Sequence, residues 1–369
     1  MQSSHIFLRN FKDTKVESTA VTMNRSASIK PEEMTSVEYD RDPFAHFGAH
    51  EPTLKDQIRT RTYRRAIYKN QHLFRGRTVL DVGCGMGILS LFAARAGASR
   101  VIAVDSSNVI DHARSVVEEN GLGHVITLVQ AKIELLEQLP HGIGHVDVIL
   151  SEWMGFCLMD RPMLNAVIYA RDKWLKPNGG VMFPDRCTLF VAGIEDRKGL
   201  DARINWWDRV YGFDMSPIRS NALIEPLVGT IGTRQLVTSS YLIKEVDMYS
   251  VEHCETTGSD LDIESPFHLI AKRDDFVHGL VTYFNVEFTS CENRIGFSTS
   301  PMTPFTHWRQ MVFYLDEGLV VKKGEEIGGM FCMKSKDASG RYPEADFQIR
   351  VRFDGELSQV DEERGYQLR

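Results

Sequence analysis

The stretch that decides the fold is Val79-Leu80-Asp81-Val82-Gly83-Cys84-Gly85-Met86-Gly87. It belongs to an apolar, β-branched run that starts at Thr78, and it ends in three alternating glycines. A segment with apolar residues at helical spacing, 88–95, follows directly. A strand, a glycine turn and a helix in this order are typical of a nucleotide-binding turn. Glycines let the backbone turn tightly and approach a ligand without a Cβ clash.

The segments around this turn alternate between strand-like and helical patterns. Further strands are predicted at 100–105, 125–129 and 146–151, and helices at 108–120 and 163–174. Because strands that alternate with helices form parallel sheets covered by those helices, we expect a doubly wound α/β domain.

After Pro184 the pattern becomes strand-rich and helical periods are scarce. The strand-like segments are 187–194, 235–248, 267–288, 308–321 and 346–353. They predict a second, mostly antiparallel β domain, with a barrel as the candidate architecture. The expected division is therefore a disordered polar segment at 1–36, an α/β domain at 37–185 and a β domain at 186–369.

Residues 196–222 interrupt the β domain with a loop-like insertion that is rich in large apolar side chains. These are Trp206, Trp207, Tyr211, Phe213 and Met215. Such a set on an insertion favours an arm that packs against another surface. The alternative is that these side chains cap the β domain itself.

The composition excludes several classes of protein. The six cysteines are scattered without a C-x-x-C pair, so we expect no metal site, no disulfide framework and a reducing compartment. The net charge of −7 argues against a dominant nucleic-acid partner and suits a basic protein substrate. No apolar run is long enough to span a membrane, and no secretory leader is visible, so no membrane association is expected.

The spacing of the glycines indicates which cofactor the turn binds. Gly83, Gly85 and Gly87 form G-x-G-x-G, and dinucleotide sites typically have G-x-G-x-x-G. Asp105 ends the next predicted strand, where a carboxylate can bind both ribose hydroxyls. The compact turn suits a cofactor without a pyrophosphate. We therefore expect S-adenosylmethionine rather than a nicotinamide cofactor, bound by this turn, by Asp81 within it and by Asp105.

Several short blocks, in the right order, resemble the protein arginine methyltransferases, and their predominant type I members most closely. The first is Ser151-Glu152-Trp153-Met154-Gly155. The others are Ala45-His46-Phe47-Gly48-Ala49-His50, Phe183-Pro184-Asp185-Arg186, Tyr211-Gly212-Phe213-Asp214-Met215 and Thr306-His307-Trp308. The likeness runs from about Tyr39 to Arg369 and is far more specific than any one motif.

This resemblance implies a fold, a set of contacts and partners. The α/β domain would be followed by a β-barrel with a dimerisation arm at about 196–222, giving a homodimer. His50 and Arg59 match positions near the methionine end of the cofactor, and Glu134 matches an adenine-side contact. Asp105 stands where the family usually has glutamate. Arginine-containing proteins would be the substrates, with histones and glycine/arginine-rich RNA-binding proteins as candidates, in the cytoplasm and nucleus.

The chemistry needs a carboxylate fork beside the methyl donor. A protonated guanidinium is a poor nucleophile, because its lone pairs are delocalised and its pKa exceeds about 12. A site must hold it rigidly, localise its charge opposite the attacking nitrogen and accept a proton. Glu152 follows a predicted strand, where such folds place their ligands. By resemblance, His307 pairs with Asp56 and assists proton removal or shapes the pocket; without the family match, a packing or capping role would be favoured for this histidine.

One position departs from the family. Its loop carries a second glutamate nine residues after the first, and this chain has Arg161 there, preceded by Asp160. A cation in that place would repel the substrate guanidinium, unless Arg161 points to solvent and Asp160 takes the vacant place. We therefore weigh two hypotheses: an active enzyme that makes mono- and asymmetric dimethylarginine, and a catalytically weak paralogue that binds cofactor as a partner or heterodimer subunit. A small-molecule methyltransferase is a distant third.

Overall fold

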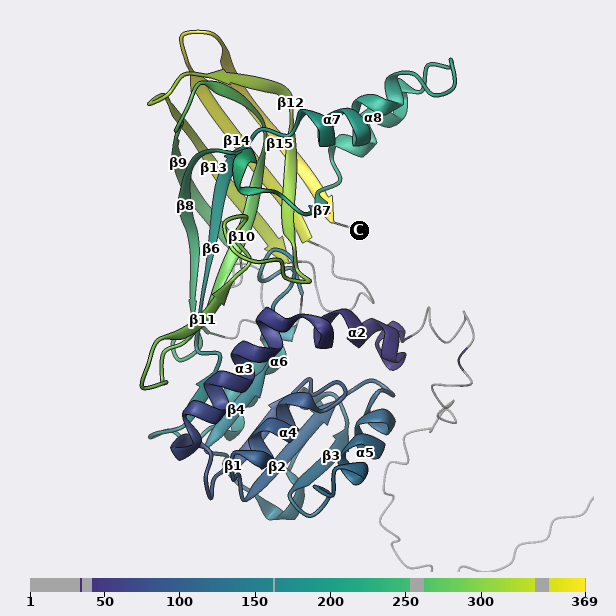
Figure 1. Cartoon of the computed structure of the whole chain (residues 1–369), viewed down its shortest axis with the longest axis vertical. Coiled ribbons are helices and arrows are strands. Elements are labelled where there is room, and N and C mark those ends of the chain that lie inside the picture. Colours follow the sequence, from purple (N-terminus) through teal and green to yellow (C-terminus); the bar gives the residue numbers. More distant parts are fainter. Residues whose placement is uncertain (1–33, 35–41, 162, 253–261, 336–344, 369) are drawn as a thin grey trace, which may run out of the picture.

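A computed structural model describes residues 34, 42–161, 163–252, 262–335 and 345–368. Apart from Met34, the segment 1–36 lies outside the described residues. Figure 1 shows an α/β body at one end, a β body at the other and a helical arm that projects from the β body. No helix in the described part of the chain has the length and apolar character to cross a membrane.

The α/β body contains a five-stranded sheet with the order β3-β2-β1-β4-β5, and every neighbouring pair in it is parallel. The strands are β1 (Thr78–Val82), β2 (Arg100–Asp105), β3 (Ile126–Gln130), β4 (Val148–Ser151) and β5 (Val181–Phe183). The helices are α2 (Phe47–Lys55), α3 (Gln57–Lys69), α4 (Ile88–Arg95), α5 (Ile110–Glu119) and α6 (Met163–Trp174). The predicted doubly wound domain is confirmed. The strand order reverses between β1 and β4, and ligands bind at the carboxyl ends of strands at such a switch point.

The β body has two antiparallel sheets, which confirms the predicted second domain. One has the order β7-β12-β10-β6-β8 with β11 paired to β10, and the other has the order β15-β14-β13-β9. The first contains β6 (Arg186–Ile194), β7 (Leu227–Gly229), β8 (Leu236–Asp247), β10 (Asp275–Phe288), β11 (Ile295–Ser298) and β12 (Gln310–Val321). The second contains β9 (Ile263–Ile270), β13 (Glu326–Ser335), β14 (Ala345–Asp354) and β15 (Gln359–Leu368). The strand-rich segment 267–288 contains the end of β9 and the whole of β10, which belong to different sheets.

The insertion is helical, so its description as loop-like was wrong. It contains α7 (Arg197–Arg203) and α8 (Ser216–Leu223), and Figure 1 shows it projecting away from the β body. Tyr211 is 94% exposed and Phe213 is 75% exposed at its tip. Aromatic rings this exposed favour the predicted arm over a cap on the β domain.

Helix α3 lies where the two bodies meet, and it packs against β11. Asp56 begins this helix, because its side chain accepts a hydrogen bond from the backbone N–H of Arg59. Asp185 lies where the chain passes from β5 to β6, and its carboxylate accepts hydrogen bonds from the N–H and hydroxyl groups of Thr289 and Ser290. The junction is therefore held by buried polar contacts as well as by apolar packing.

Candidate active site

The glycine turn after β1 has the backbone that its sequence requires. Gly83, Gly85 and Gly87 have φ values of +71°, +54° and +82°, a region that side chains with a Cβ rarely adopt. A Cβ at Gly85 would lie 3.0 Å from Nδ1 of His50. The other ring nitrogen of His50, Nε2, is 2.7 Å from the carbonyl oxygen of Phe44. His50 therefore lies directly against the turn.

Asp105, at the end of β2, is fixed beside the same turn. Its two oxygens accept hydrogen bonds from the N–H groups of Gly85 (2.8 Å) and Ser107 (2.9 Å). Burial raises the pKa of this carboxyl, and the two N–H donors oppose the rise. Asp42 accepts hydrogen bonds from the Ser107 hydroxyl and the Asn108 N–H, which ties the preceding chain to this edge. A carboxylate held in one orientation here can receive ribose hydroxyls.

Asp81 lies on β1 and is fully buried. Its Oδ2 accepts a short hydrogen bond of 2.6 Å from the Ser90 hydroxyl, and its Oδ1 has no partner among the described residues. Burial raises the pKa of this carboxyl to about 6, despite the hydrogen bond from Ser90. A buried oxygen without a partner beside a glycine turn fits a site that a polar ligand completes.

Asp81 should make the stability of the cofactor-free protein depend on pH. Its pKa is raised in the fold, so its contribution is fully present below the unfolded pKa, near 3.8, and is lost as the pH rises through about 6. One pKa unit corresponds to about 1.4 kcal/mol, so the loss is about 3 kcal/mol. Asp81→Asn mimics the protonated form and should be more stable than the wild type at pH 7.5 by about that amount, and about equal near pH 4. Urea unfolding at both pH values measures this, and a constant difference between them would contradict it.

Arg59 and Glu152 meet at the carboxyl end of β4. Nη2 of Arg59 is 3.3 Å from Oε2 of Glu152, and both side chains are largely buried. The Arg59 Nε has no partner among the described residues, and its guanidinium lies 5.5 Å from the ring centroid of Tyr63. The Tyr63 hydroxyl donates to the carbonyl oxygen of Ser151. The fold thus places a cation with an unused donor and a carboxylate side by side at the switch point.

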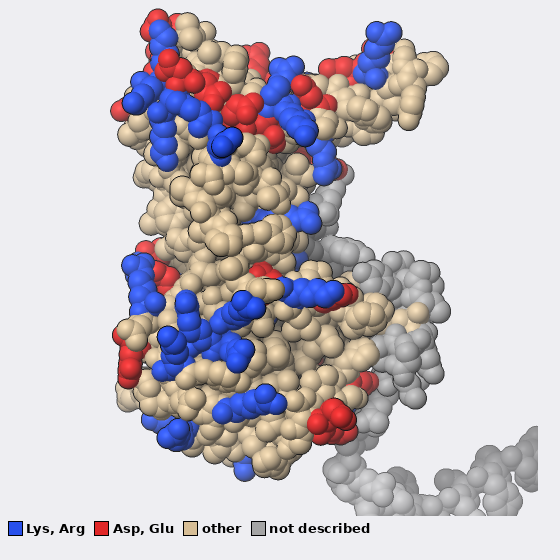
Figure 2. All heavy atoms as spheres, in the orientation of Figure 1, with Lys and Arg blue, Asp and Glu red and all other residues tan. Residues whose placement is uncertain are grey.

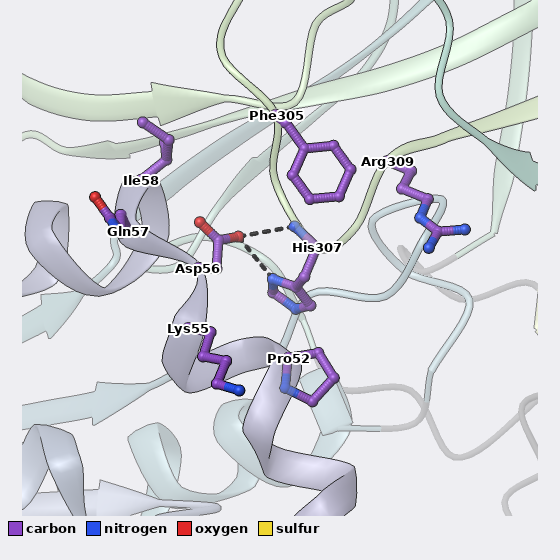
Figure 3. A pocket seen from close by; sticks show the side chains of 8 residues that line it. All are labelled: Pro52, Lys55, Asp56, Gln57, Ile58, Phe305, His307 and Arg309. Carbon is purple, nitrogen blue, oxygen red and sulfur yellow. Dashed lines mark hydrogen bonds and ion pairs between the residues drawn. The ribbon is translucent and has the colours of Figure 1, made fainter.

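The pair predicted between His307 and Asp56 is present (Figure 3). Oδ2 of Asp56 accepts from the backbone N–H of His307 at 2.9 Å and lies 2.8 Å from the ring Nδ1. Burial raises the pKa of Asp56, but the hydrogen bonds from His307 and Arg59 outweigh it and hold that pKa below its usual value. The pair borders a cavity of about 450 Å³. Its walls also include Lys55, Phe305 and Arg309, all drawn in Figure 3.

The loop after Glu152 folds back on itself. Oδ1 of Asp160 accepts from the N–H of Cys157 at 2.8 Å, and its Oδ2 is buried without a partner. Leu158 has a φ of +64°, so the turn is tight. The Arg161 guanidinium lies 5.1 Å from the ring centroid of Phe156. Asp160 and Arg161 thus contact residues of their own loop, and the role of Asp160 as a substrate carboxylate stays a prediction.

The structure gathers most of the predicted site residues along one edge of the sheet. The three glycines form the turn after β1, and beside it lie His50, Asp81 and Asp105. The side chains of Arg59 and Glu152 meet at the carboxyl end of β4. Glu134, on the short helix η4 (Ile133–Leu135) after β3, is exposed. Sequence reasoning missed Tyr63 and Ser90, which orient the site through hydrogen bonds. A polar residue within an apolar helix was the only sequence signal for Ser90.

Comparison with known proteins identifies the family. Residues 79–179 match the model of a methyltransferase domain, and residues 185–356 match that of the arginine methyltransferase oligomerization subdomain. Protein arginine N-methyltransferase 8-B of Danio rerio is 49% identical over 341 residues, which are 92% of this chain and 79% of the relative. This chain belongs to the protein arginine N-methyltransferase family. Protein arginine N-methyltransferase 1 of Caenorhabditis elegans is 47% identical over 93% of this chain and 96% of its own length.

Solved structures of protein arginine methyltransferases share the fold. A chain of the Trypanosoma brucei PRMT1 enzyme–prozyme heterotetrameric complex with AdoHcy has a TM-score of 0.81 and 40% identity. That match covers 89% of this chain and 100% of the other. Arabidopsis thaliana protein arginine methyltransferase 10, in an open conformation, has a TM-score of 0.75 and 26% identity over 89% of this chain and 99% of its own. The whole two-body architecture is therefore that of the family.

Proposed function

We propose that this chain binds S-adenosylmethionine and transfers its methyl group to a guanidinium nitrogen of arginine in proteins, giving mono- and asymmetric dimethylarginine. The observation that carries the proposal is the buried Arg59–Glu152 pair, which lies at the switch point beside the glycine turn. The residues fit the cofactor, because the three glycines of the turn lack Cβ atoms and Asp81 and Arg59 each keep a buried polar atom without a partner among the described residues. These atoms can be satisfied by a ligand with hydroxyl, amine and carboxylate groups.

Each residue of this site has a distinct task. When bound, S-adenosylmethionine supplies an electrophilic methyl on a positively charged sulfur. Asp105 receives the ribose hydroxyls, and Arg59 binds the carboxylate at the methionine end. Glu152 holds the substrate guanidinium and draws its positive charge away from the attacking nitrogen. Asp56 fixes His307 through two hydrogen bonds, so that the imidazole stays at the cavity and can assist removal of the proton.

The test is transfer of a radiolabelled methyl group to a glycine- and arginine-rich peptide. We expect labelled arginine, with ω-monomethyl and asymmetric dimethyl products after acid hydrolysis. No incorporation at high enzyme concentration, with cofactor binding demonstrated by calorimetry, would overturn the proposed activity. Symmetric dimethylarginine would overturn the product assignment alone.

Asp105→Asn should weaken cofactor binding by about 10- to 100-fold, because an amide loses the charge-assisted hydrogen bonds to ribose hydroxyls. The variant keeps the shape of the side chain and one oxygen for the Gly85 N–H. Isothermal titration with S-adenosylmethionine measures the effect. Asp111→Asn on the exposed side of α5 is the matched control and should bind as the wild type does. Equal affinity of Asp105→Asn and the control would exclude the ribose contact.

A catalytically weak partner subunit is the second candidate, and Arg161 favours it. One structural relative forms an enzyme–prozyme heterotetrameric complex, and this chain has an exposed aromatic arm suited to oligomers. In that case, mixing this chain with an active family member should give more methyl transfer than the sum of the two alone. A mixture that gives only the sum would exclude this candidate.

A further inference from the structure

The outer surface of α3 carries four exposed cations. Arg61, Arg64, Arg65 and Lys69 project from this helix, and together they are named here the basic face. Figure 2 shows blue side chains gathered over the position of α3, with tan surface between them. The inner residues of the same helix, Arg59 and Tyr63, are buried at the active site. One short helix thus separates the catalytic site from a concentrated positive surface.

The cations of the basic face have no acidic partners within the described part of the chain. No carboxylate oxygen there lies within 4 Å of Arg61, Arg64, Arg65 or Lys69, whereas several other exposed arginines do have carboxylate partners. Arg186 pairs with Glu245 at 2.7 Å, and Arg350 makes a double hydrogen bond with Asp361. The basic face therefore gathers, on one helix, four cations without carboxylate partners among the described residues, in a protein whose net charge is −7.

The arrangement of these charges costs helix stability. Arg61, Arg65 and Lys69 are spaced four residues apart, so each is a surface neighbour of the next. Like charges at this spacing destabilise a helix by a few tenths of a kcal/mol per pair. The same row presents cations at intervals of about 6 Å along the helix axis. Such a row is unfavourable alone and becomes favourable when a chain of anionic groups lies along it.

We propose that the basic face binds single-stranded RNA through its phosphates. Three of the four cations are arginines, whose planar guanidinium matches a phosphate with two hydrogen bonds. The guanidinium of Arg64 lies 5.4 Å from the ring centroid of the half-buried Tyr68, so aromatic surface adjoins the cations. Cations beside an aromatic ring are the elements of non-specific single-strand sites. The expectation of no nucleic-acid partner rested on the negative net charge of the whole chain. The basic face, in contrast, is locally positive.

RNA on the basic face would lie on the far side of α3 from Glu152 and Arg59. An α-helix with its side chains is about 10–12 Å across, so the bound strand would be close to the catalytic site without entering it. A protein that is itself bound to RNA would then be held near the enzyme. The binding step needs no methyl transfer, so it can fail or succeed independently of the proposed activity.

Fluorescence anisotropy of the full chain with a labelled, unstructured 20-nucleotide RNA tests this inference. Each phosphate contact on a single strand contributes about −0.7 to the slope of log K against log salt concentration, so four contacts give about −2.8. Affinity should fall by about 50-fold between 50 and 200 mM KCl. The triple variant Arg61→Gln, Arg65→Gln, Lys69→Gln keeps one phosphate contact, so its slope should be about −0.7. Its affinity for RNA should then fall only about threefold over the same salt range.

The matched control removes the same charge from paired arginines. Arg197→Gln, Arg350→Gln, Arg352→Gln should keep the slope of the wild type, because these side chains already have carboxylate partners. The inference is overturned if RNA does not bind at 50 mM KCl, or if both variants lose affinity equally. It is also overturned if polyglutamate binds the same residues more tightly than RNA, since the partner would then be an acidic protein. If the triple variant does not fold, the single variants Arg61→Gln and Arg65→Gln should each reduce the slope by about 0.7.

Discussion

Arg161→Glu should raise kcat/KM for methyl transfer to an arginine peptide by about 100- to 1000-fold. The resemblance to the family leads us to expect a glutamate nine residues after Glu152, and this chain has Arg161 there. A cation about 4 Å from the substrate guanidinium, at an effective dielectric of about 20, costs roughly 4 kcal/mol. Every 1.4 kcal/mol is a tenfold change in rate, so repulsion of this size corresponds to about a thousandfold. Steady-state kinetics with a glycine- and arginine-rich peptide measure the gain.

Arg161→Gln separates the loss of repulsion from the gain of a carboxylate. Glutamine removes the positive charge and adds no anion, so we expect an intermediate rate. In the structure the Arg161 guanidinium lies over the ring of Phe156, so the cation has a favourable cation–π contact within its own loop. If neither substitution changes the rate, Arg161 stays over the Phe156 ring during the reaction, and its repulsion of the substrate guanidinium does not limit catalysis. The buried Asp160 would then be the second carboxylate to examine.

The fold could be predicted wherever the local pattern was strong. Strand β1 and helices α4 and α6 have the predicted bounds, because continuous apolar runs and helical spacing dominate those segments. Helix α3 was missed because its exposed arginines obscure the few buried positions, which include Tyr63, Ala66 and Ile67.

Strand β15 was missed for a different reason. Two of its side chains, Glu362 and Arg364, are ion-paired to each other, and Arg364 also reaches Asp316 of β12. Its sequence therefore lacks the alternation of apolar and polar residues that marks a half-buried strand. One partner of Arg364, Asp316, comes from another strand, so only the tertiary structure reveals this ion-pair pattern.

The candidate site could be predicted where one turn supplies its residues, and less well where distant segments meet. Gly83, Gly85 and Asp105 follow from a strand–turn–helix unit and the strand after it. The contact between Arg59 and Glu152 joins segments that only the packing of α3 against the sheet brings together. The hydrogen bond from Cys157 to Asp160 depends on the tight turn at Leu158, which no sequence pattern indicated.

Glu152→Gln should lower kcat by at least about 1000-fold. The carboxylate is the only group in the proposed mechanism that polarises the substrate guanidinium, and a neutral amide cannot draw its charge to one side. The matched control is Glu51→Gln, which removes an exposed carboxylate of α2 that pairs with Lys55. The control should keep kcat within about twofold, because an exposed ion pair contributes little. A loss of similar size in both variants would remove Glu152 from the mechanism.

The effect of Glu152→Gln must be separated from a structural role, because its carboxylate is also the partner of the buried Arg59. Loss of that partner costs stability, of the order of 1–3 kcal/mol, and leaves the cation free to bind a ligand carboxylate. We therefore expect a lower melting temperature but an affinity for S-adenosylmethionine at least equal to that of the wild type. Glu152→Asp keeps the charge and moves it by one methylene, which should cost about 100-fold in kcat. Full activity of Glu152→Asp would mean that charge alone suffices. Measurements in the Arg161→Glu background keep these losses detectable if the wild-type rate is low.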